Sequence, residues 1–482
     1  MRVLIKNENL WIFPIVLLFI IINALLIYKG HFWLNFLPFV ILILFFAIFS
    51  LDTLMFIIIA LVPLSIPLSK LIHGINSRVD LPVEPIVAGI MILFFIKIIY
   101  NESFDKRILK HPITLAISFN LAWILISCVT STMPVISIKF FLSRLWFVVV
   151  FYFIATQFFA KYQNTIKYIW FYSFSMVVVI VYFLIRLNIE GLTNQLAANW
   201  VVEPFYNDHT AYAAALCLLI PNLIGIFFIK KKTNFFIKFL QITLILFYLM
   251  ALVLSYSRAA WLSLVLALGF FFGMFLGLRL RFMFLIIGVL VGLFFIFKTE
   301  IIIGLERNKQ DSSNNLSKHI KSISNINSDA SNMERINRWN CAMRMFKDKP
   351  VFGFGPGTYM FKYAPYQVKS EKTIISTNEG NGGNAHSEYL GPLSESGLFG
   401  FLSFLAIVIT TMYTASKIYF KTKRRKVKIL AISLLVGLFS YYLHGAMNNF
   451  LDTDKLSALF WGFTAMIVAL DVYHSPKLAD KD

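Results

Sequence analysis

Five side chains in the second half of the chain could together support transfer of a phosphate-linked group. They are Arg258, Arg335, Arg338, His386 and Glu395. A guanidinium group can bind two phosphate oxygens at once, and an imidazole titrates near neutrality, so it can accept a proton from an attacking hydroxyl. Arginines that hold a departing pyrophosphate and a histidine that activates a nucleophile would therefore suit one reaction.

Arg258 lies in the segment 255–261, at the predicted mouth between two membrane spans. A charge at the edge of a bilayer is costly unless it pairs, faces water or reaches the interface, so a functional role is the default interpretation. The alternative is that Arg258 only marks the interface beside Trp261. One arginine at a membrane surface, joined by others from an overhanging loop, would suit a lipid-linked pyrophosphate.

Arg335 and Arg338 belong to a predicted amphipathic helix, 332–346, which stops before the glycine-rich turn 353–357. If helical, both arginines share a broad face that could point at the membrane. Trp339 and the glycine turn suggest that this part of the chain packs down onto the bundle. The alternative is a solvated helix surface with ordinary arginines.

His386 follows a stretch rich in glycine and asparagine and is predicted to lie on an exposed, sharply bent segment. We expect a helix to start near Ala385 and to run towards Gly397. The structural alternative for His386 is a helix-start residue that satisfies local backbone groups. Glu388 and Glu395 follow in the sequence. Glu395 could orient the histidine, receive the proton instead or form a structural hydrogen bond.

Several other polar residues give weaker functional signals. Asp452 and Asp454 have the spacing of a divalent-cation site, but the match is short and common by chance, so a structural role at a helix end is favoured. Lys139 and Arg144 could add positive potential or simply reach the interface. His209, at a predicted helix start, is expected to cap or pack. No metal site and no cofactor are predicted.

The composition is that of a polytopic membrane protein. Of 482 residues, 59% are hydrophobic and 14% are charged, whereas soluble domains average about 25% charged residues. Apolar runs long enough to cross a ~30 Å hydrocarbon core indicate helices and not a barrel. The net charge of +20 reflects cationic loops in this class, so nucleic acid is not an expected partner. The cysteines Cys128, Cys217 and Cys341 predict no disulfide.

The expected fold is an all-α polytopic membrane protein with about 12–14 transmembrane helices and one large extracytoplasmic loop that contains short helices. The first apolar run is too long for a cleaved signal peptide and is expected to be the first span. The apolar windows fall near 10–28, 32–50, 53–69, 82–100, 112–130, 140–160, 167–186, 209–229, 236–256, 259–277, 281–297, 397–416, 429–446 and 456–472.

The distribution of lysine and arginine predicts which connections face the cytoplasm. With the N-terminus inside, the cation-rich connections lie on the cytoplasmic side, and the loops 187–208, 298–396 and 447–455 lie on the opposite side. Within the long loop, 311–332 is rich in serine and asparagine and is expected to be mobile or disordered. The predicted location is a bacterial inner membrane, with the large loop in the periplasm.

This orientation divides the chain into three parts. Residues 1–297 form a predicted N-terminal helix bundle. Residues 298–396 form the large periplasmic loop that holds most of the candidate site residues. Residues 397–482 supply further transmembrane helices and a short cytoplasmic tail. ATP and sugar nucleotides are not available on the periplasmic side.

Together, the motifs resemble those of the O-antigen ligase and O-antigen polymerase superfamily. The resemblance covers most of the chain in hydrophobic layout and about 250–400 in motif. The family often has Asn after the histidine, where Ser387 stands here, and the segment 205–210 departs from a Pro-Asn pattern associated with the family. The matching pieces are Ser257-Arg258 before an apolar span, Arg335 four residues before Trp339, the turn 353–357, the segment 386–390 and the segment 395–397.

The resemblance implies a membrane glycosyltransferase that moves a glycan from undecaprenyl pyrophosphate to an acceptor hydroxyl, without a metal. Arg258 and Arg335 match family arginines assigned to the pyrophosphate donor, and His386 matches the proposed base. We expect an inverting transfer, with Arg338 as a further pyrophosphate ligand. The acceptor could be the lipid A core, as in a ligase, another lipid-linked glycan, as in a polymerase, or a protein, as in an O-oligosaccharyltransferase.

A transporter or flippase of the same lipid-linked glycans is the alternative from another class. It predicts charges buried along several spans and a path through the midplane of the bilayer, whereas the candidate residues here gather at one face. The two hypotheses differ in where the donor accumulates when His386 is replaced by alanine. An enzyme would leave lipid-linked glycan on the outer leaflet, and a flippase would leave it on the inner leaflet.

Overall fold

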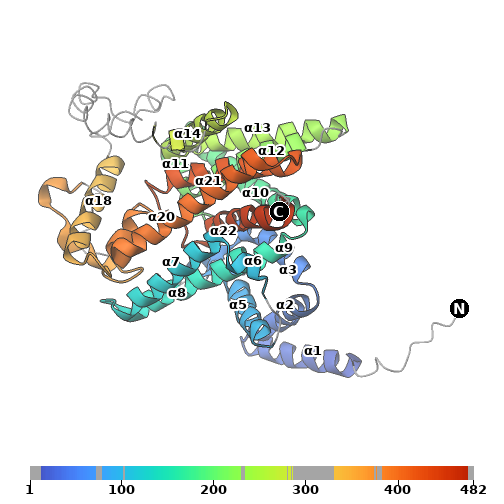
Figure 1. Cartoon of the computed structure of the whole chain (residues 1–482). Coiled ribbons are helices and arrows are strands. Elements are labelled where there is room, and N and C mark those ends of the chain that lie inside the picture. Colours follow the sequence, from blue (N-terminus) through green and yellow to red (C-terminus); the bar gives the residue numbers. More distant parts are fainter. Residues whose placement is uncertain are drawn as a thin grey trace. The chain divides into compact units, whose positions relative to one another are not determined.

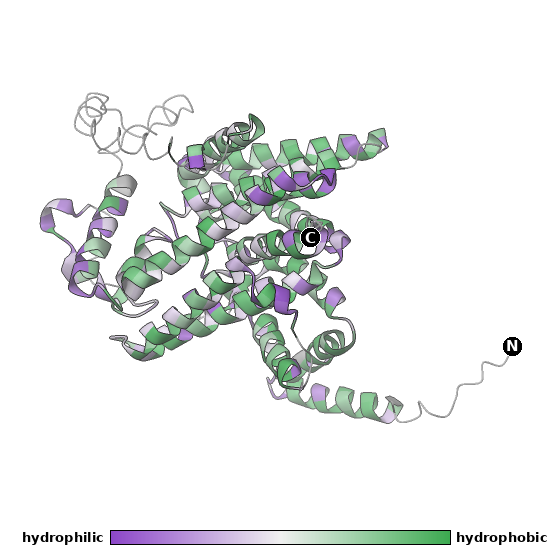
Figure 2. Ribbon diagram, in the orientation of Figure 1, coloured by the Kyte–Doolittle hydropathy of each residue, from purple (hydrophilic) through white to green (hydrophobic). Residues whose placement is uncertain are grey.

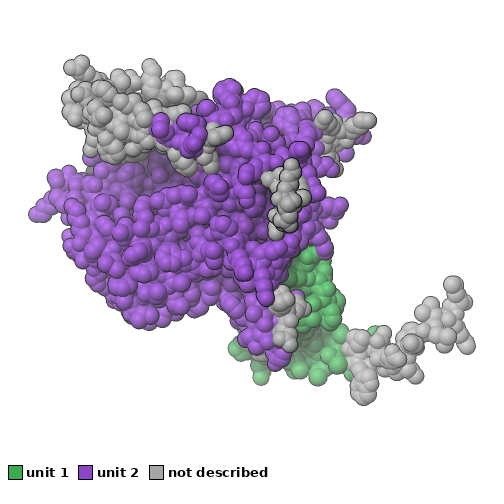
Figure 3. Space-filling view, viewed as in Figure 1, with its two compact units in different colours: residues 1–57 green, residues 58–482 purple. Residues whose placement is uncertain are grey.

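The computed structural model of the protein describes residues 12–71, 79–100, 104–229, 234–278, 281–283, 285, 330–373, 376 and 383–475. The chain divides into two compact units, Met1–Ile57 and Ile58–Asp482 (Figure 3). All five candidate site residues belong to the second unit. Of the segment predicted to be mobile, only 330–332 is described, and it begins a helix.

The first unit contains short apolar helices. Its elements are α1 (Ile12–Tyr28), η2 (Trp33–Phe36), α2 (Leu37–Phe49) and the beginning of α3 (Leu51–Leu61). The side-chain amide of Asn23 donates to the side-chain oxygen of Asn35 over 2.7 Å and ties α1 to η2. Most apolar side chains of α1 and α2 are exposed, as expected of helices whose surroundings are hydrocarbon.

The second unit is a helix bundle with one small hairpin. The hairpin pairs β1 antiparallel to β2, with Ile66 opposite Leu81. The elements after α3, in chain order, are η3 (Val62–Leu64), β1 (Ile66–Pro67), α4 (Leu68–Leu71), β2 (Asp80–Leu81), α5 (Val83–Ile99), α6 (Lys106–Leu109), α7 (Pro112–Val129), α8 (Pro134–Val148), η4 (Val149–Ile154), α9 (Ala155–Phe158), α10 (Tyr162–Glu190), α11 (Gln195–Ala198), α12 (His209–Ile229), α13 (Phe235–Leu254), α14 (Arg258–Phe275), α18 (Ala330–Asp348), α19 (Tyr359–Lys362), η5 (Ala364–Tyr366), η6 (Lys369–Glu371), α20 (Leu390–Lys421), α21 (Arg425–His444), α22 (Asp454–Ala469) and η7 (Leu470–His474).

The described residues form an all-α polytopic membrane protein, as predicted. Nine of their helices are long and apolar enough to cross a membrane, and three shorter apolar helices lie near the N-terminus. Figure 2 shows that apolar residues predominate along these helices, with polar residues concentrated at helix ends and around α18. Most predicted spans within the described residues overlap a helix, whereas the predicted span 53–69 divides into α3, η3, β1 and the start of α4. The predicted span 281–297 lies outside them, apart from 281–283 and 285.

The centre of the second unit is formed by α12, α21 and α22. In each of these spans 83% of the most apolar window is buried, compared with 17% in α13, which therefore lies at the periphery. α12 and α21 approach closely because glycine lies between them. A side chain at Gly225 would meet Ser433 at 2.6 Å, and one at Gly437 would meet the carbonyl oxygen of Leu218 at 2.6 Å.

Four long helices begin at the same end of the second unit. The Tyr256 hydroxyl donates to the carbonyl of Leu192 over 3.0 Å, so the connection between α13 and α14 meets the connection after α10. The Glu388 amide donates to the carbonyl of Gly445 over 2.7 Å, so the start of α20 meets the connection between α21 and α22. The first residues of α12, α14, α20 and α22 therefore define one end of the bundle, here called the loop end (Figure 1).

Residues 330–373 form a small helical layer on the start of α20. α18 packs on α20, and the short helices α19, η5 and η6 pack against α18 or α20 (Figure 1). The layer has its own apolar core, which includes Cys341, Met345 and Tyr363. The predicted helix at 332–346 is confirmed, and it extends to 330–348.

A glycine-rich turn attaches this layer to the bundle. Gly353, Gly355 and Gly357 all have positive φ, as the predicted turn requires. A side chain at Gly355 would meet the Ser131 hydroxyl at 1.9 Å, so glycine permits close contact with the connection between α7 and α8. The Gly355 amide also donates to the Glu395 carbonyl over 2.8 Å. The turn therefore joins α18 to both α7–α8 and α20.

α20 starts later than predicted and contains a break. Its first helical residue is Leu390, whereas the sequence predicted a start near Ala385. The difference arises because residues 383–389 are held in turns by side chains of α18 and of their own segment. Gly397, with φ 71°, interrupts the helix, and the amide of the following Leu398 donates to the Pro350 carbonyl over 2.8 Å.

Candidate active site

The loop end brings three separate elements together around a histidine that the sequence analysis did not consider. Arg335 acts electrostatically on the imidazoles of both His386 and His444. His444, the last residue of α21, also contacts the backbone of Ala259, the residue after Arg258. Residues from α14, α18, α21 and the segment before α20 thus share one region of the bundle.

His386 lies on a sharp backbone bend. Its φ of 47° falls in the left-handed region, which residues other than glycine rarely adopt. The Asn384 side-chain oxygen accepts the His386 amide over 3.1 Å, and the Trp339 indole donates to the His386 carbonyl over 3.3 Å. The predicted bend is therefore present. The imidazole is partly buried and not exposed as predicted, because α18 packs over this segment.

The pKa of His386 is lowered to about 4, mainly because burial removes hydration from the charged imidazole. The guanidinium groups of Arg338 and Arg335 lower the pKa further, while Asp208 and Glu334 act in the opposite direction. His386 is therefore neutral at neutral pH and can accept a proton. A bound anion beside these arginines would offset their charge and raise the pKa of the histidine.

Arg338 is engaged by the protein itself. Its Nε donates to Glu334 over 2.8 Å, and its Nη1 donates to the Asn384 carbonyl over 3.2 Å. The guanidinium lies 5.1 Å from the ring centroid of Tyr363, and only 4% of Arg338 is exposed. A side chain at Gly383 would overlap this guanidinium and displace it. Arg338 thus braces the backbone that leads to His386.

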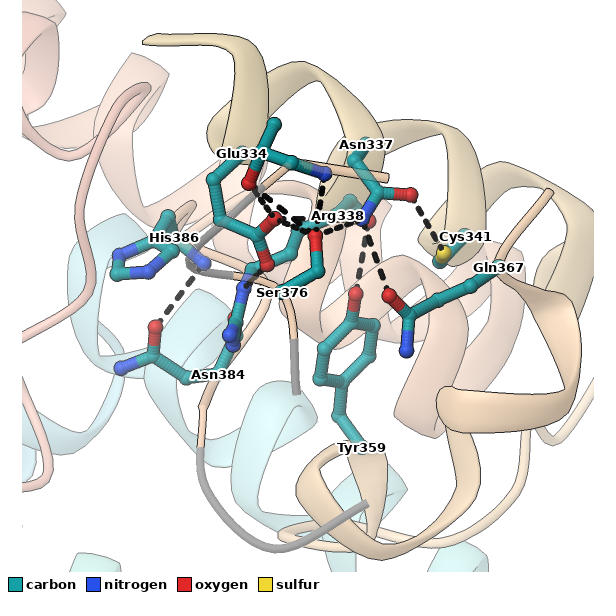
Figure 4. A network of polar contacts seen from close by, with 10 residues as sticks. Glu334, Asn337, Arg338, Cys341, Tyr359, Gln367, Ser376, Asn384 and His386 are labelled. Atoms are coloured by element: carbon teal, nitrogen blue, oxygen red, sulfur yellow. Dashed lines mark hydrogen bonds and ion pairs between the residues drawn. The ribbon is translucent and has the colours of Figure 1, made fainter. Parts of the chain in front are cut away.

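Glu334 is the centre of a polar network that holds α18 to the 373–376 segment (Figure 4). It accepts hydrogen bonds from Thr373 over 3.0 Å and from Ser376, in addition to Arg338. Burial acts to raise the pKa of Glu334, but hydrogen bonds from Ser376 and Arg338 outweigh it, so the pKa lies below its usual value. In Figure 4 the imidazole of His386 points away from this network.

Arg258 is the first residue of α14. The turn before it is tight, because Tyr256 has a φ of 53° and Ser255 closes the end of α13 with a hydrogen bond to the Leu252 carbonyl of 2.6 Å. The Trp261 indole donates to the same carbonyl over 2.9 Å. Arg258 is partly buried, so its charge lies at the boundary of the bundle, on the first turn that His444 contacts.

Asp208 and His209 begin α12 close to the two histidines. Asp208 caps the helix, since its Oδ1 accepts the amides of Thr210 over 2.7 Å and Ala211 over 2.8 Å. Its charge also acts on both His386 and His444. His209 acts on His444 as well. The segment 205–210, which departs from the family pattern, therefore belongs to the same region.

Glu395 lies beside the glycine turn. Its Oε1 accepts the amide of Tyr359 over 2.9 Å, and its carbonyl accepts the amide of Gly355 over 2.8 Å. The charged groups that act most strongly on Glu395 are Asp452 and Arg144. Glu395 therefore fixes the layer of α18 against α20, and its carboxylate faces a different set of charges from those that surround His386.

The acidic pair at the start of α22 separates into two environments. Asp454 accepts a hydrogen bond from Lys455 over 3.0 Å and one from Ser65, and Lys455 also pairs with Asp80 over 3.2 Å. Asp452 is exposed and acts on the acidic residues near the start of α20. Among the described residues, no three His, Cys, Asp or Glu side chains form a group that could hold a metal.

The electrostatics of the loop end suit an anion. Helix N-termini carry partial positive charge, and α12, α14, α20 and α22 all begin here. Arg258 and Arg335 add full positive charges from two of the surrounding elements. A phosphate group would therefore meet guanidinium groups and helix dipoles of the same sign.

Comparison with known proteins identifies the middle of the chain. Residues 243–405 match a family model described as O-antigen ligase. This stretch of the chain is therefore similar to O-antigen ligases. A stretch of 133 residues is also 26% identical to an uncharacterized protein of Haemophilus influenzae, over 28% of this chain and 32% of that protein. The matched stretch thus spans about a third of that relative's length.

The matched stretch 243–405 contains all five residues predicted for the site. Asp208, His209 and His444 lie outside it and were not predicted as site residues, although they act on His386 or on each other. His444 has a faint signal in the sequence, since a histidine ends an apolar span four residues before Asn448. The match to this family model supports a membrane glycosyltransferase-like role for this chain.

Proposed function

We propose that this protein is an inverting glycosyltransferase whose donor is a glycan linked to undecaprenyl pyrophosphate. The observation that carries the proposal is that Arg335 acts electrostatically on His386 and on His444, and that His444 contacts the first turn of α14, the helix that begins with Arg258. We further propose that the loop end faces the periplasm of a bacterial inner membrane. The pattern of cationic connections supports that orientation.

The donor pyrophosphate would lie between Arg258 and Arg335. Guanidinium groups match phosphate oxygens in charge and geometry, and they stabilise a departing anion without the help of a metal. The lipid tail would pass sideways between helices into the bilayer. Arg338 would position His386, since its guanidinium already binds Glu334 and the Asn384 carbonyl.

The reaction would proceed in one displacement. An acceptor hydroxyl gives its proton to His386 while its oxygen bonds to the anomeric carbon. The bond between that carbon and the phosphate oxygen breaks, and its electron pair leaves with undecaprenyl pyrophosphate. Attack from the face opposite the leaving group inverts the anomeric configuration. The two arginines hold the negative charge that develops on the leaving oxygen.

Donor binding would also prepare the base. Without substrate, the pKa of His386 is lowered to about 4, which makes the imidazole a weak base. The negative charges of a pyrophosphate beside Arg335 would cancel part of the field that disfavours the imidazolium. The base would thus gain strength when the donor is in place, so that proton transfer accompanies glycosyl transfer.

The experiment is transfer in liposomes that contain the purified full chain and a polyprenyl-pyrophosphate glycan, with alternative acceptors. We expect His386→Ala and Arg258→Ala to lower the transfer rate by at least about a hundredfold. His31→Ala and Arg281→Ala, which change exposed residues far along the chain from the site, are the matched controls and should transfer at the normal rate.

Full transfer by both His386→Ala and Arg258→Ala would overturn the proposal. The acceptor that is used would separate the remaining possibilities. Transfer to a lipid A core indicates a ligase, growth of lipid-linked chains indicates a polymerase, and a glycosylated polypeptide indicates a protein O-oligosaccharyltransferase. The anomeric configuration of the product tests inversion, and activity in EDTA tests independence from a metal.

A further inference from the structure

Glu388, two residues after His386, is buried with an unusual set of donors. Its carboxylate oxygen Oε1 accepts the amide of Phe450 over 2.7 Å, the amide of Leu451 over 2.9 Å and the hydroxyl of Tyr441 over 2.7 Å. Only 5% of Glu388 is exposed. A buried carboxyl group is costly unless it is well hydrogen-bonded, and three donors to one oxygen supply that compensation here.

Two of the three donors, the amides of Phe450 and Leu451, belong to one short connection between α21 and α22, called here the 445–451 turn, whereas Tyr441 lies in α21. The backbone repeats the contact, because the Glu388 amide donates to the Gly445 carbonyl over 2.7 Å. A side chain at Gly445 would lie 3.1 Å from the Cγ atom of Glu388, so the approach is close. Both the backbone amide and the side-chain carboxyl group of Glu388 thus bind the 445–451 turn, which joins the turn to segment 386–389.

The same turn reaches the donor side of the proposed site. His444 immediately precedes this turn. The Nε2 atom of His444 lies 3.2 Å from the side-chain nitrogen Nδ2 of Asn448, within the turn. The His444 carbonyl accepts the amides of Met447 over 3.0 Å and Asn448 over 3.1 Å. Because His444 also contacts the first turn of α14, the 445–451 turn connects the segment of His386 to the helix that begins with Arg258.

We infer that Glu388 is a positioning residue. Its hydrogen bonds to the 445–451 turn fix the place of His386 relative to Arg258. This inference rests on the proposed function, in which His386 is the base. Oε1 of Glu388 accepts hydrogen bonds from two backbone amides and a tyrosine hydroxyl. The part of Glu388 is therefore to orient the His386 segment and not to accept the substrate proton. His386 lies before the first residue of α20, so no helix fixes its backbone. The bend at His386 therefore depends on contacts with neighbouring segments.

The test compares Glu388→Ala with Glu388→Gln in the full-length protein. Glutamine keeps a side-chain oxygen that can accept the same hydrogen bonds, so it should restore most of the function. We expect Glu388→Ala to lower kcat by about a hundredfold with donor KM changed less than threefold, because misplacement of a catalytic group affects mainly the chemical step. Glu388→Gln should stay within about tenfold of the parent kcat.

Tyr441→Phe is a milder variant in case Glu388→Ala fails to fold. It removes one hydroxyl that donates to Glu388 and should lower kcat by a few-fold. Tyr442→Phe, at the neighbouring position of α21, is the matched control and should leave kcat unchanged. Equal loss in Glu388→Gln and Glu388→Ala would overturn the inference, because it would mean that the acid itself takes part in the reaction.

A second readout does not depend on glycan transfer. Diethyl pyrocarbonate modifies neutral histidines, and mass spectrometry of the peptide that contains His386 gives its rate of modification. We expect that rate, and its dependence on pH, to change in Glu388→Ala and to stay at the parent value in Glu388→Gln. Unchanged modification and unchanged kcat in Glu388→Ala would refute the positioning role. An inactive parent protein with these modification differences intact would refute only the proposed function.

Discussion

Arg335 and Arg338 lie one turn apart on α18 and differ in what surrounds them. Arg338 is buried, pairs with Glu334 and donates to the backbone before His386. Arg335 is partly exposed and acts on both His386 and His444. One arginine thus supports the layer of α18, whereas the other lies between the layer and the bundle, where a ligand could be bound.

The difference shows why residue type alone does not define this site. Both arginines lower the pKa of His386, so both affect the base electrostatically. Only the pairing of Arg338 with Glu334 gives it a large share in stability, because removal of one partner would leave a buried charge without compensation. The comparison therefore predicts that substitution of Arg335 changes activity and that substitution of Arg338 changes stability first.

Arg335→Ala should produce the largest loss of activity among these variants. We expect transfer to fall by about 10²–10³-fold, the range for removal of a group that stabilises developing negative charge. The melting temperature should stay within a few degrees of the parent value, since Arg335 lies at the surface of the layer. Arg335→Lys should recover part of the rate, because lysine keeps the charge and loses the two-pronged geometry. A large fall in melting temperature would contradict the comparison.

Arg338→Ala should instead destabilise the protein. Breaking a buried ion pair by removal of one partner costs about 3–5 kcal/mol. Thermal unfolding in detergent, followed by the fluorescence of a thiol-reactive dye at the buried cysteines, measures the effect. The double variant with Glu334→Leu and Arg338→Met removes both charges and should regain most of the lost stability. Equal instability of the single and double variants would show that the pair is not the cause.

Much of this architecture could be predicted from the sequence. Hydrophobic windows located the membrane helices, since the bilayer demands length and apolar composition. The helix that carries Arg335 and the glycine-rich turn 353–357 also followed from spacing and residue type. Such features depend on local rules, which a single sequence contains.

Long-range packing accounts for what could not be predicted. His444 lies 58 positions after His386 in the sequence, and no local sequence pattern predicts that Arg335 acts on both histidines. The burial of Arg338 depends on Glu334 at helical spacing but also on Tyr363 and Asn384 from other segments. The delayed start of α20 has the same origin, because α18 holds the residues before Leu390 in turns.

The pH dependence of activity offers a finer test of the two arginines. Since the pKa of His386 is lowered to about 4, kcat/KM should be flat above about pH 5 and fall below it. Removal of the positive charge of Arg335 or of Arg338 should raise the pH at which kcat/KM begins to fall. The double variant at 334 and 338 removes both an opposing and a supporting charge, so it should shift the inflection less than Arg335→Ala does.

The same pKa has a consequence for stability. In the unfolded chain His386 titrates near 6.5, so between about pH 6.5 and 4 the unfolded state binds more protons than the folded state. The contribution of His386 is therefore constant above that window, and stability is lost as the pH falls through it. His386→Gln should show a smaller fall in melting temperature across the window, and an identical fall would contradict the lowered pKa.

Ser387 should give the smallest effect and tests how the bend at His386 tolerates change. Its hydroxyl oxygen lies 3.2 Å from the amide nitrogens of both Tyr389 and Leu390, so it caps the start of α20 from the position after His386. Ser387→Ala should cost about 1 kcal/mol, as loss of a helix cap does, and should lower transfer a few-fold. Ser387→Asn, which has the residue common in the family, keeps a side-chain oxygen for the same amides and should match the parent. If Ser387→Ala and Ser387→Asn lose activity equally, the hydroxyl has a role beyond capping. If neither variant loses activity, the hydrogen bonds of Asn384 and Trp339 are enough to maintain the bend at His386.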